Sequence, residues 1–184
     1  HRLAATRQRA MLPEQAEVTG LDVWTYYAPS SGHAQVGGDW YDVLQVEPEG
    51  VVVVIGDVVG HDVEAAAAMG QLRSIVRAFA YDGADPGEVL NRVDQLVAGM
   101  RIPRSASLVL VTMLPTDGGW TMRYSRAGHL PPLVAHAGEV GQLSDAAGPM
   151  IGFGSGGRSS GTHAMVPGDV LVLYTDGLIE RRDR

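Results

Sequence analysis

Cysteine and long apolar runs are both absent from the sequence. Without cysteine there are no disulfides and no thiolate metal sites, which fits a reducing compartment. No run approaches the roughly 20 apolar residues that a membrane helix needs. The N-terminal residues are polar and basic and do not resemble a signal peptide. We therefore expect a cytoplasmic protein with no membrane segment in these residues.

Basic side chains are also scarce relative to acidic ones. The chain has 14 Lys and Arg against 21 Asp and Glu, giving a formal net charge of −7. This balance argues against a nucleic-acid partner, because a phosphate backbone needs a basic surface. A phosphorylated protein remains a possible substrate if a divalent metal reverses the charge locally. The length of 184 residues suits one domain with a sizeable core.

Aspartates recur at the ends of apolar runs. The continuous run Val51–Val59 predicts a central strand buried on both faces, and it contains Asp57 near its end. Asp39 follows two glycines, and Asp176 ends the run that begins at Val170. Two carboxylates about 4 Å apart repel by roughly 4 kcal/mol at an effective dielectric of about 20. A cluster of three therefore persists only with protonation or with bound cations, and carboxylate ligands select hard cations such as Mg²⁺ or Mn²⁺.

The order of predicted elements indicates the fold class. Strands come first, two helices follow, and further strands complete the chain, which favours an α+β fold over a βαβ alternation. The helices are predicted over 3–12, before Pro13, over Val63–Tyr81, capped by Asp62, and over Pro86–Met100. The predicted strands are Val18–Ala28, Val51–Val59, Ser107–Leu114, Trp120–Tyr124, Leu133–Ala137, Gly141–Leu143 and Val170–Thr175.

A glycine- and serine-rich stretch, Gly148–Gly161, contains a formal G-x-G-x-x-G match at residues 152–157. A dinucleotide fingerprint requires that motif to open a helix, whereas the residues that follow have a loop composition. Ser155 lacks the strand-to-helix elbow of a hydrolase nucleophile. We therefore interpret this stretch as a mobile surface loop.

Taken together, five motifs resemble the SpoIIE/RsbU branch of the PPM-type (protein phosphatase 2C-like) serine/threonine phosphatases. They occur in the family's order as Gly37-Gly38-Asp39-Trp40-Tyr41-Asp42, Ile55-Gly56-Asp57-Val58-Val59-Gly60-His61, Ala65-Ala66-Ala67-Ala68-Met69, Ala127-Gly128-His129-Leu130-Pro131-Pro132 and Pro167-Gly168-Asp169 with Tyr174-Thr175-Asp176-Gly177-Leu178-Ile179-Glu180. Each motif alone is weak, whereas the ordered set is specific.

The resemblance implies two antiparallel β-sheets packed face to face and flanked by helices, with two Mn²⁺ or Mg²⁺ ions between the sheets. It implies that Asp57 bridges both metals and that the backbone carbonyl of Val58, where the family usually has glycine, binds one. Asp39 and Asp176 would ligate a metal or hold a metal-bound water on either side. The implied reaction is hydrolysis of phosphoserine or phosphothreonine by a metal-activated water. The implied substrate is a phosphorylated STAS-domain anti-anti-sigma protein.

The sequence also departs from the family pattern. Eukaryotic members of the superfamily have a histidine two residues after the bridging aspartate, where this chain has Val59; His61 lies at a different offset. The family's domain continues with a helix and a strand whose aspartate completes one metal site. This sequence ends at Arg184, and Asp183 is too close to Asp176 to be that residue. We therefore expect the C-terminal helix and strand to be missing from this fragment, and its metal site to be empty or partly filled.

The expected organisation is a linker helix over 1–13, joined to an upstream sensor domain, and a phosphatase domain over 14–184. By analogy with the family, the linker helix would influence formation of a homodimer. Two other function classes were considered. A non-catalytic regulatory module on the same fold would bind a STAS-type partner without turning it over. A nucleotide phosphodiesterase is disfavoured because the sequence offers no base-stacking or phosphate-cradling motif.

Overall fold

Strand β2 (Gly50–Val58) is an interior strand of the larger sheet in the computed structural model, which describes residues 18–26, 38–46, 49–102, 104–154 and 156–176. It pairs antiparallel with β1 (Asp39–Val46) on one side and with β3 (Ala106–Thr116) on the other. The run of valines therefore forms an interior strand covered on both faces, as predicted, although it lies next to the edge strand β1 and not in the middle of the sheet. The predicted helix over residues 3–12 lies outside the described residues.

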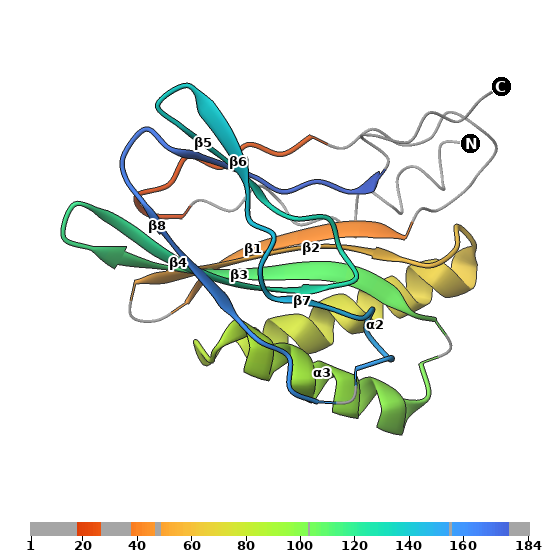
Figure 1. Cartoon of the computed structure of the whole chain (residues 1–184). Helices are drawn as coiled ribbons and strands as arrows, with labels where there is room; N and C mark the ends of the chain where they lie inside the picture. Colours follow the sequence, from red (N-terminus) through yellow and green to blue (C-terminus); the bar gives the residue numbers. More distant parts are fainter. Residues whose placement is uncertain (1–17, 27–37, 47–48, 103, 155, 177–184) are drawn as a thin grey trace, which may run out of the picture.

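Two sheets are present in the described residues, and Figure 1 shows the smaller one on the side of the larger sheet away from the helices. The larger sheet has the order β1-β2-β3-β4-β7, with β8 also paired to β4, and the smaller has the order β6-β5-β9. The remaining strands are β4 (Gly119–Ala127), β5 (Leu133–His136), β6 (Glu139–Gln142), β7 (Ala147–Gly148), β8 (Gly161–Met165) and β9 (Val170–Val172). Apart from the short β4–β7 pair, every pairing is antiparallel.

Helices α2 (Val63–Ala80) and α3 (Pro86–Met100) cover the other face of the larger sheet (Figure 1). Asp62 caps α2 by accepting a hydrogen bond from the amide of Ala65 at 2.8 Å, as predicted. Proline at the first turn starts α3 at the predicted residue. The α+β class is therefore confirmed, with helices on one outer face among the residues that the structure describes. None of the described helices is long and apolar enough to span a membrane.

Alternation along the strands separates two cores, because successive side chains point to opposite faces. One core lies between α2, α3 and the larger sheet and includes Val54, Leu72 and Leu108. The other lies between the two sheets and includes Val109 and Val134. The partly buried Val53 and Ile55 of β2 pack against this second core. Asp57, two residues beyond Ile55, therefore belongs to the face between the sheets.

The predicted strand over Val18–Ala28 is wrong for residues 18–26, which pair with no strand. Val18 is buried, and Leu21 and Val23 pack against the core between the sheets. Trp24 and Tyr26 instead stack on each other with ring centroids 6.1 Å apart and remain exposed. Their strand propensity reflects a preference for packing on pleated surfaces. Here each aromatic ring packs against the other ring and not against a neighbouring strand.

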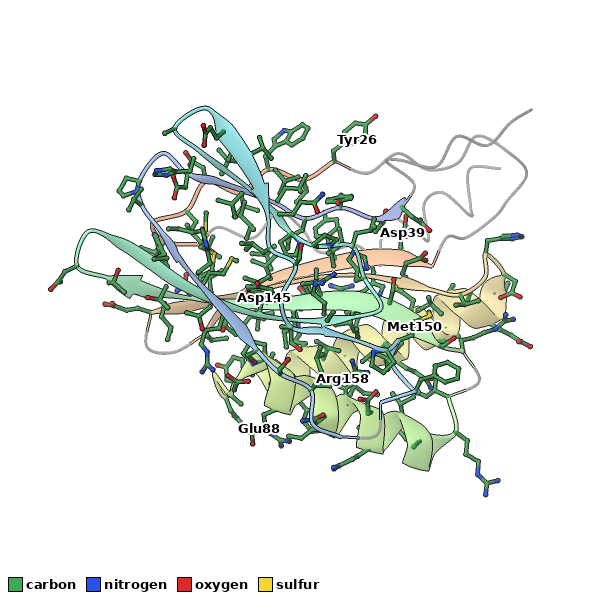
Figure 2. All side chains as sticks on the ribbon, viewed as in Figure 1. Tyr26, Asp39, Glu88, Asp145, Met150 and Arg158 are labelled. Carbon is green, nitrogen blue, oxygen red and sulfur yellow. The ribbon has the colours of Figure 1, made fainter. Side chains whose placement is uncertain are left out.

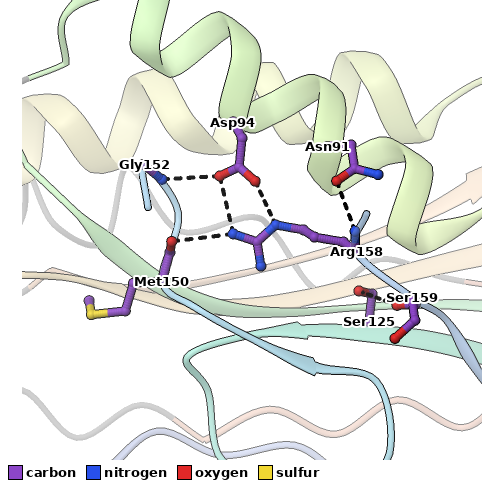
Figure 3. A network of polar contacts seen from close by, with 7 residues as sticks. All are labelled: Asn91, Asp94, Ser125, Met150, Gly152, Arg158 and Ser159. Atoms are coloured by element: carbon purple, nitrogen blue, oxygen red, sulfur yellow. Dashed lines mark hydrogen bonds and ion pairs between the residues drawn. The ribbon is translucent and has the colours of Figure 1, made fainter. Parts of the chain in front are cut away.

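The described residues between β7 and β8, 149–154 and 156–160, form a connecting loop, as predicted for most of this stretch, but a buried ion pair ties this loop to α3 (Figure 3). Arg158 donates through Nε to Asp94 Oδ2 at 2.6 Å and through Nη2 to Asp94 Oδ1 at 3.1 Å. Asp94 also accepts from the amide of Gly152, and Asn91 accepts from the amide of Arg158. The interpretation as a free surface loop therefore fails, because charge pairing over a long sequence separation anchors it.

Candidate functional site

A row of polar side chains crosses one end of the larger sheet. Asp39 on β1 lies directly opposite Asp57 on β2, and Asp57 lies directly opposite Ser107 on β3. Directly opposed residues in an antiparallel pair share a face. The row therefore faces the smaller sheet, and Figure 2 shows Asp39 on this side of β1, away from the helices. The structure thus brings together two of the three aspartates predicted from sequence.

Glycines beside these aspartates make room for the close approach of other groups. A Cβ at Gly38 would come within 2.1 Å of the Val58 carbonyl oxygen and 2.9 Å of Asp57 Oδ1. A Cβ at Gly56 would meet the indole of Trp40, its directly opposed partner, at 2.8 Å. The recurrent Gly-Asp pairs of the sequence are therefore explained by packing between β1 and β2.

The third predicted aspartate reaches the same region from the smaller sheet. The hydroxyl of Thr175 donates to Asp39 Oδ2 at 3.1 Å. The next residue, Asp176, lines a cavity of about 380 Å³ together with Asp57. The other residues lining this cavity are Ser107, Arg126, Gly128, His129, Leu130 and Pro131. The cavity is partly open to solvent, and Asp176 in its lining is exposed.

Burial raises the pKa of Asp39, because a charged carboxylate loses hydration there. Hydrogen bonds with Thr175 and Asp57 lower that pKa, whereas the negative charge of Asp176 raises it. Ionisation of Asp39 is therefore opposed unless positive charge is added nearby.

The donor types fit a hard divalent cation. Asp39, Asp57 and Asp176 offer carboxylate oxygens and Val58 offers a carbonyl, the ligands that Mg²⁺ and Mn²⁺ prefer. The crowding of Gly38 against the Val58 carbonyl puts this oxygen beside Asp57. Among the described residues, however, no three His, Cys, Asp or Glu side chains are already grouped closely enough to hold a metal. The described side chains therefore supply suitable ligands without a preformed cage.

His129 is a site residue to which the sequence assigned no role. It is buried, its Nδ1 is 3.1 Å from Ser107 Oγ, and its Nε2 is 2.7 Å from the Tyr174 carbonyl oxygen. The guanidinium of Arg126 binds the carbonyls of His129, Ser144 and Asp145. The Ala127-Gly128-His129 motif was the sequence signal that pointed to His129. The residues that His129 binds are 22 and 45 residues away, so the sequence did not reveal its role.

The two residues at which the sequence departs from the histidine pattern of eukaryotic members lie at the entrance to α2. Val59 and His61 are both exposed and line no part of the cavity beside Asp57. Asp62 next to them is bound by Arg104 at 2.7 Å. This segment therefore begins a helix, and neither side chain reaches the aspartate row.

Comparison with known proteins identifies relatives over nearly the whole chain. The family model of Stage II sporulation protein E (SpoIIE) matches residues 47–184. The phosphoserine phosphatase RsbU of Bacillus subtilis is 22% identical over 183 residues, covering 98% of this chain and 53% of RsbU. The phosphoserine phosphatase RsbP of the same organism is 25% identical over 182 residues, covering 97% of this chain and 44% of RsbP. The chain thus spans about half the length of these two relatives.

Solved structures of related phosphatase domains are also similar to this chain. The RsbU and RsbW domains of a Mycobacterium tuberculosis protein superpose with a TM-score of 0.72 at 37% identity, covering 85% of this chain and 43% of that one. The PP2C phosphatase domain of SpoIIE from Bacillus subtilis superposes with a TM-score of 0.64 at 16% identity, covering 77% and 42%. The second likeness supports the fold alone. With the family match over residues 47–184, these findings show that the chain belongs to the SpoIIE family, in the SpoIIE/RsbU-like branch of the PPM-type phosphatases.

Proposed function

We propose that this chain is the catalytic domain of a metal-dependent protein serine/threonine phosphatase. The observation that best supports the proposal is the meeting of Asp39, Asp57 and Asp176 at one end of the space between the sheets. Burial of Asp39 and the negative charge of Asp176 oppose ionisation of the Asp39 carboxyl without cations, and the oxygen donors of the three residues suit Mn²⁺ or Mg²⁺. An acidic chain can then accept a phosphate group because the bound metals reverse the local charge.

Each of these residues has a distinct role in the proposed site. Asp57 and the Val58 carbonyl would hold the metal ions from β2. Asp39, which accepts a hydrogen bond from Thr175, and the solvent-exposed Asp176 would supply the other protein ligands. When bound, the two cations supply the charge that neutralises a phosphoryl group and the acidity that activates water. Because the cavity lined by Asp57 and Asp176 is partly open to solvent, a phosphorylated side chain on a protein surface could approach the row.

The physiological substrate that we propose is phosphoserine or phosphothreonine on a STAS-type anti-anti-sigma protein. The similarity to RsbU and RsbP, both named phosphoserine phosphatases, supports phosphoserine as the substrate. We further propose that residues 1–13 connect residues 14–184 to an upstream sensor domain, with a homodimer as the assembly through which it acts. Release of phosphate from a phosphorylated STAS protein, compared with p-nitrophenyl phosphate, tests the substrate.

Hydrolysis of p-nitrophenyl phosphate by a protein extended past Arg184, with and without Mn²⁺, tests the activity. We expect Mn²⁺-dependent turnover that Asp57→Ala abolishes. Asp117→Ala, in the turn between β3 and β4, is the matched control, because it removes an exposed carboxylate away from the row. If the extended protein is inactive and Asp57→Ala does not change Mn²⁺ binding, the enzyme proposal fails. Binding of the STAS partner without turnover would then favour a regulatory module.

A further inference from the structure

We propose that His129 is a positioning residue that holds residues 174–176 against the larger sheet, so that the Asp176 carboxylate joins Asp57 at the metal site. This inference rests on the proposed function and deepens it. It assigns to the histidine of the Ala127-Gly128-His129 motif a role in assembling the site, without contact to the metal or the substrate.

The need for such a residue follows from where β9 ends. The last residue of β9 in register with β5 is Val172, opposite Leu133. Residues 173–176 therefore continue beyond the ladder, and ladder hydrogen bonds cannot fix Asp176. Among the described residues, this segment is held by packing of Leu173 against the core between the sheets and by two hydrogen bonds, one from His129 to the Tyr174 carbonyl and one from the Thr175 hydroxyl to Asp39. Both hydrogen bonds are part-buried, and the one from His129 is the shorter, at 2.7 Å.

The backbone of His129 is itself firmly held. Gly128 has a positive φ of 61°, and its amide donates to the Gly148 carbonyl at 2.7 Å. A Cβ at Gly128 would collide with Met150, so glycine is required at this bend. The Arg126 guanidinium binds the His129 carbonyl at 3.0 Å. The imidazole therefore projects from a rigid bend into the space beside β3.

The hydrogen-bond partners define the state of the ring. A carbonyl oxygen can only accept, so Nε2 carries the proton and donates to Tyr174. In the neutral ring Nδ1 then accepts from the hydroxyl of Ser107. Burial lowers the pKa of His129, and this favours the neutral ring.

The contacts of His129 connect residues 174–176 with the row of polar side chains on the larger sheet. Ser107 lies opposite Asp57, and Asp57 lies opposite Asp39. Asp39 accepts from Thr175, which follows the residue that His129 binds. The histidine thus sets the distance between the segment bearing Asp176 and the row bearing Asp57. Residues that orient metal ligands from behind typically change metal affinity about 10–100-fold when replaced.

Two substitutions of His129 separate its two hydrogen bonds. In His129→Gln, the longer amide can still donate to the Tyr174 carbonyl, whereas in His129→Asn the shorter amide reaches only the Ser107 side. Isothermal titration with Mn²⁺ alone, on a protein extended past Arg184, measures affinity without depending on turnover. We expect His129→Asn to weaken Mn²⁺ binding by about 10–100-fold and His129→Gln to recover most of that loss.

Ser107→Ala provides a second route if His129→Asn does not fold. It keeps the donor to Tyr174 while freeing the ring to tilt, so we expect a smaller loss than for His129→Asn, of roughly threefold to tenfold. The matched control is His136→Gln, since His136 also uses a ring nitrogen for one bond, to Asp169, but is exposed at the end of β5. That control should leave Mn²⁺ affinity unchanged.

A spectroscopic readout tests the hydrogen bonds directly. Two-bond ¹H–¹⁵N correlation spectra should show His129 as the Nε2-protonated neutral tautomer, and Ser107→Ala should shift its Nδ1 resonance. If Asp57→Ala abolishes Mn²⁺ binding while folded His129→Asn and Ser107→Ala bind like the wild type, the positioning role is refuted and the proposed function stands. If the extended protein is inactive and Asp57→Ala leaves Mn²⁺ binding intact, the proposed function itself is refuted.

Discussion

Asp39 and Asp42 lie three residues apart on β1 and point to opposite faces of the larger sheet. Asp42 is buried against α2, where Arg77 binds it through Nε and Nη2, each at 2.7 Å. Asp39 faces the smaller sheet, where the described groups interacting with it include Thr175, Asp57 and Asp176. The same strand therefore presents one carboxylate that the chain neutralises itself and one that meets further carboxylates.

Substituting Arg77 with alanine should destabilise the fold, because Asp42 would stay buried with its main partner removed. We expect a loss of about 1–3 kcal/mol in the free energy of unfolding, moderated because Arg77 is half exposed. Arg73→Ala is the matched control, since Arg73 Nε lies 4.0 Å from Asp42 and should contribute less. Urea denaturation measures both, and an equal loss in the two variants would contradict the assignment.

Asp39→Asn, unlike Arg77→Ala, should not destabilise the metal-free protein. It removes a carboxyl group whose ionisation is opposed by burial, so the metal-free protein should be no less stable than the wild type. The wild type should gain about 2.7 kcal/mol at a free Mn²⁺ concentration 100-fold above the dissociation constant. Asp39→Asn should lose most of that gain. Thermal unfolding with and without Mn²⁺ measures the difference, and full Mn²⁺ stabilisation of the variant would exclude Asp39 as a ligand.

Gly38→Ala should damage the site more than the fold. The added methyl group would press on the Val58 carbonyl and on Asp57, forcing the end of β1 away from β2. A displacement of about 1 Å can reduce catalysis by roughly 100-fold. Gly99→Ala, at a helix position with open space, is the control and should keep full activity. Phosphatase assays should separate them; equal rates would mean that the Gly38 contact is unimportant.

The cap of α2 should give the fold a measurable pH dependence. The hydrogen bond from the Ala65 amide, aided by the charge of Arg104, lowers the pKa of Asp62 below its usual 3.8. A lowered folded-state pKa contributes stability above pH 3.8, and this contribution is lost as the pH falls through the folded-state value. Asp62→Asn caps without titrating, so the difference in melting temperature between wild type and variant should shrink between pH 6 and pH 3. A constant difference would contradict the coupling.

Loss of Arg158 should be among the most destabilising single changes. Its side chain and that of Asp94 are only 3% and 6% exposed, so Arg158→Ala leaves an uncompensated buried charge. We expect a loss of about 3–5 kcal/mol, with the double change Arg158→Met, Asp94→Leu costing less than the single one. Hydrogen exchange should show faster opening at Gly152, whose amide donates to Asp94. A double variant as unstable as the single would argue against the ion pair as the cause.

The sequence predicted the elements whose signals are local. The aspartate cap predicts the start of α2 at Val63, and the first-turn proline predicts the start of α3 at Pro86. The continuous valines predict that β2 is an interior strand, covered on both faces. Asp39 and Asp57 were found because glycine precedes each of them. The strand predicted around Trp24 failed because aromatic residues favour any packed, half-buried surface and do not specify a neighbouring strand.

Local sequence patterns could not predict the contacts between residues that lie far apart in the chain. His129 binds Ser107 and Tyr174 across 22 and 45 residues, and Arg158 binds Asp94 across 64 residues. Nothing in the composition of the glycine-rich loop indicates that it would be fixed by a buried charge. Such pairings depend on the topology that brings β3, the bend after β4 and the end of β9 together.

The separation of the aspartates along the chain also has a consequence for biosynthesis. Asp39 and Asp57 belong to a hairpin of neighbouring strands, whereas Asp176 follows β9. At about 5–20 residues per second, the ribosome adds Asp176 on the order of ten seconds after Asp57. The nascent chain can therefore form the β1–β2 hairpin and helices α2 and α3 well before Asp176 is added. Under the proposed function, catalytic competence should consequently appear late in translation, after the helices and the first strands of the larger sheet have been made.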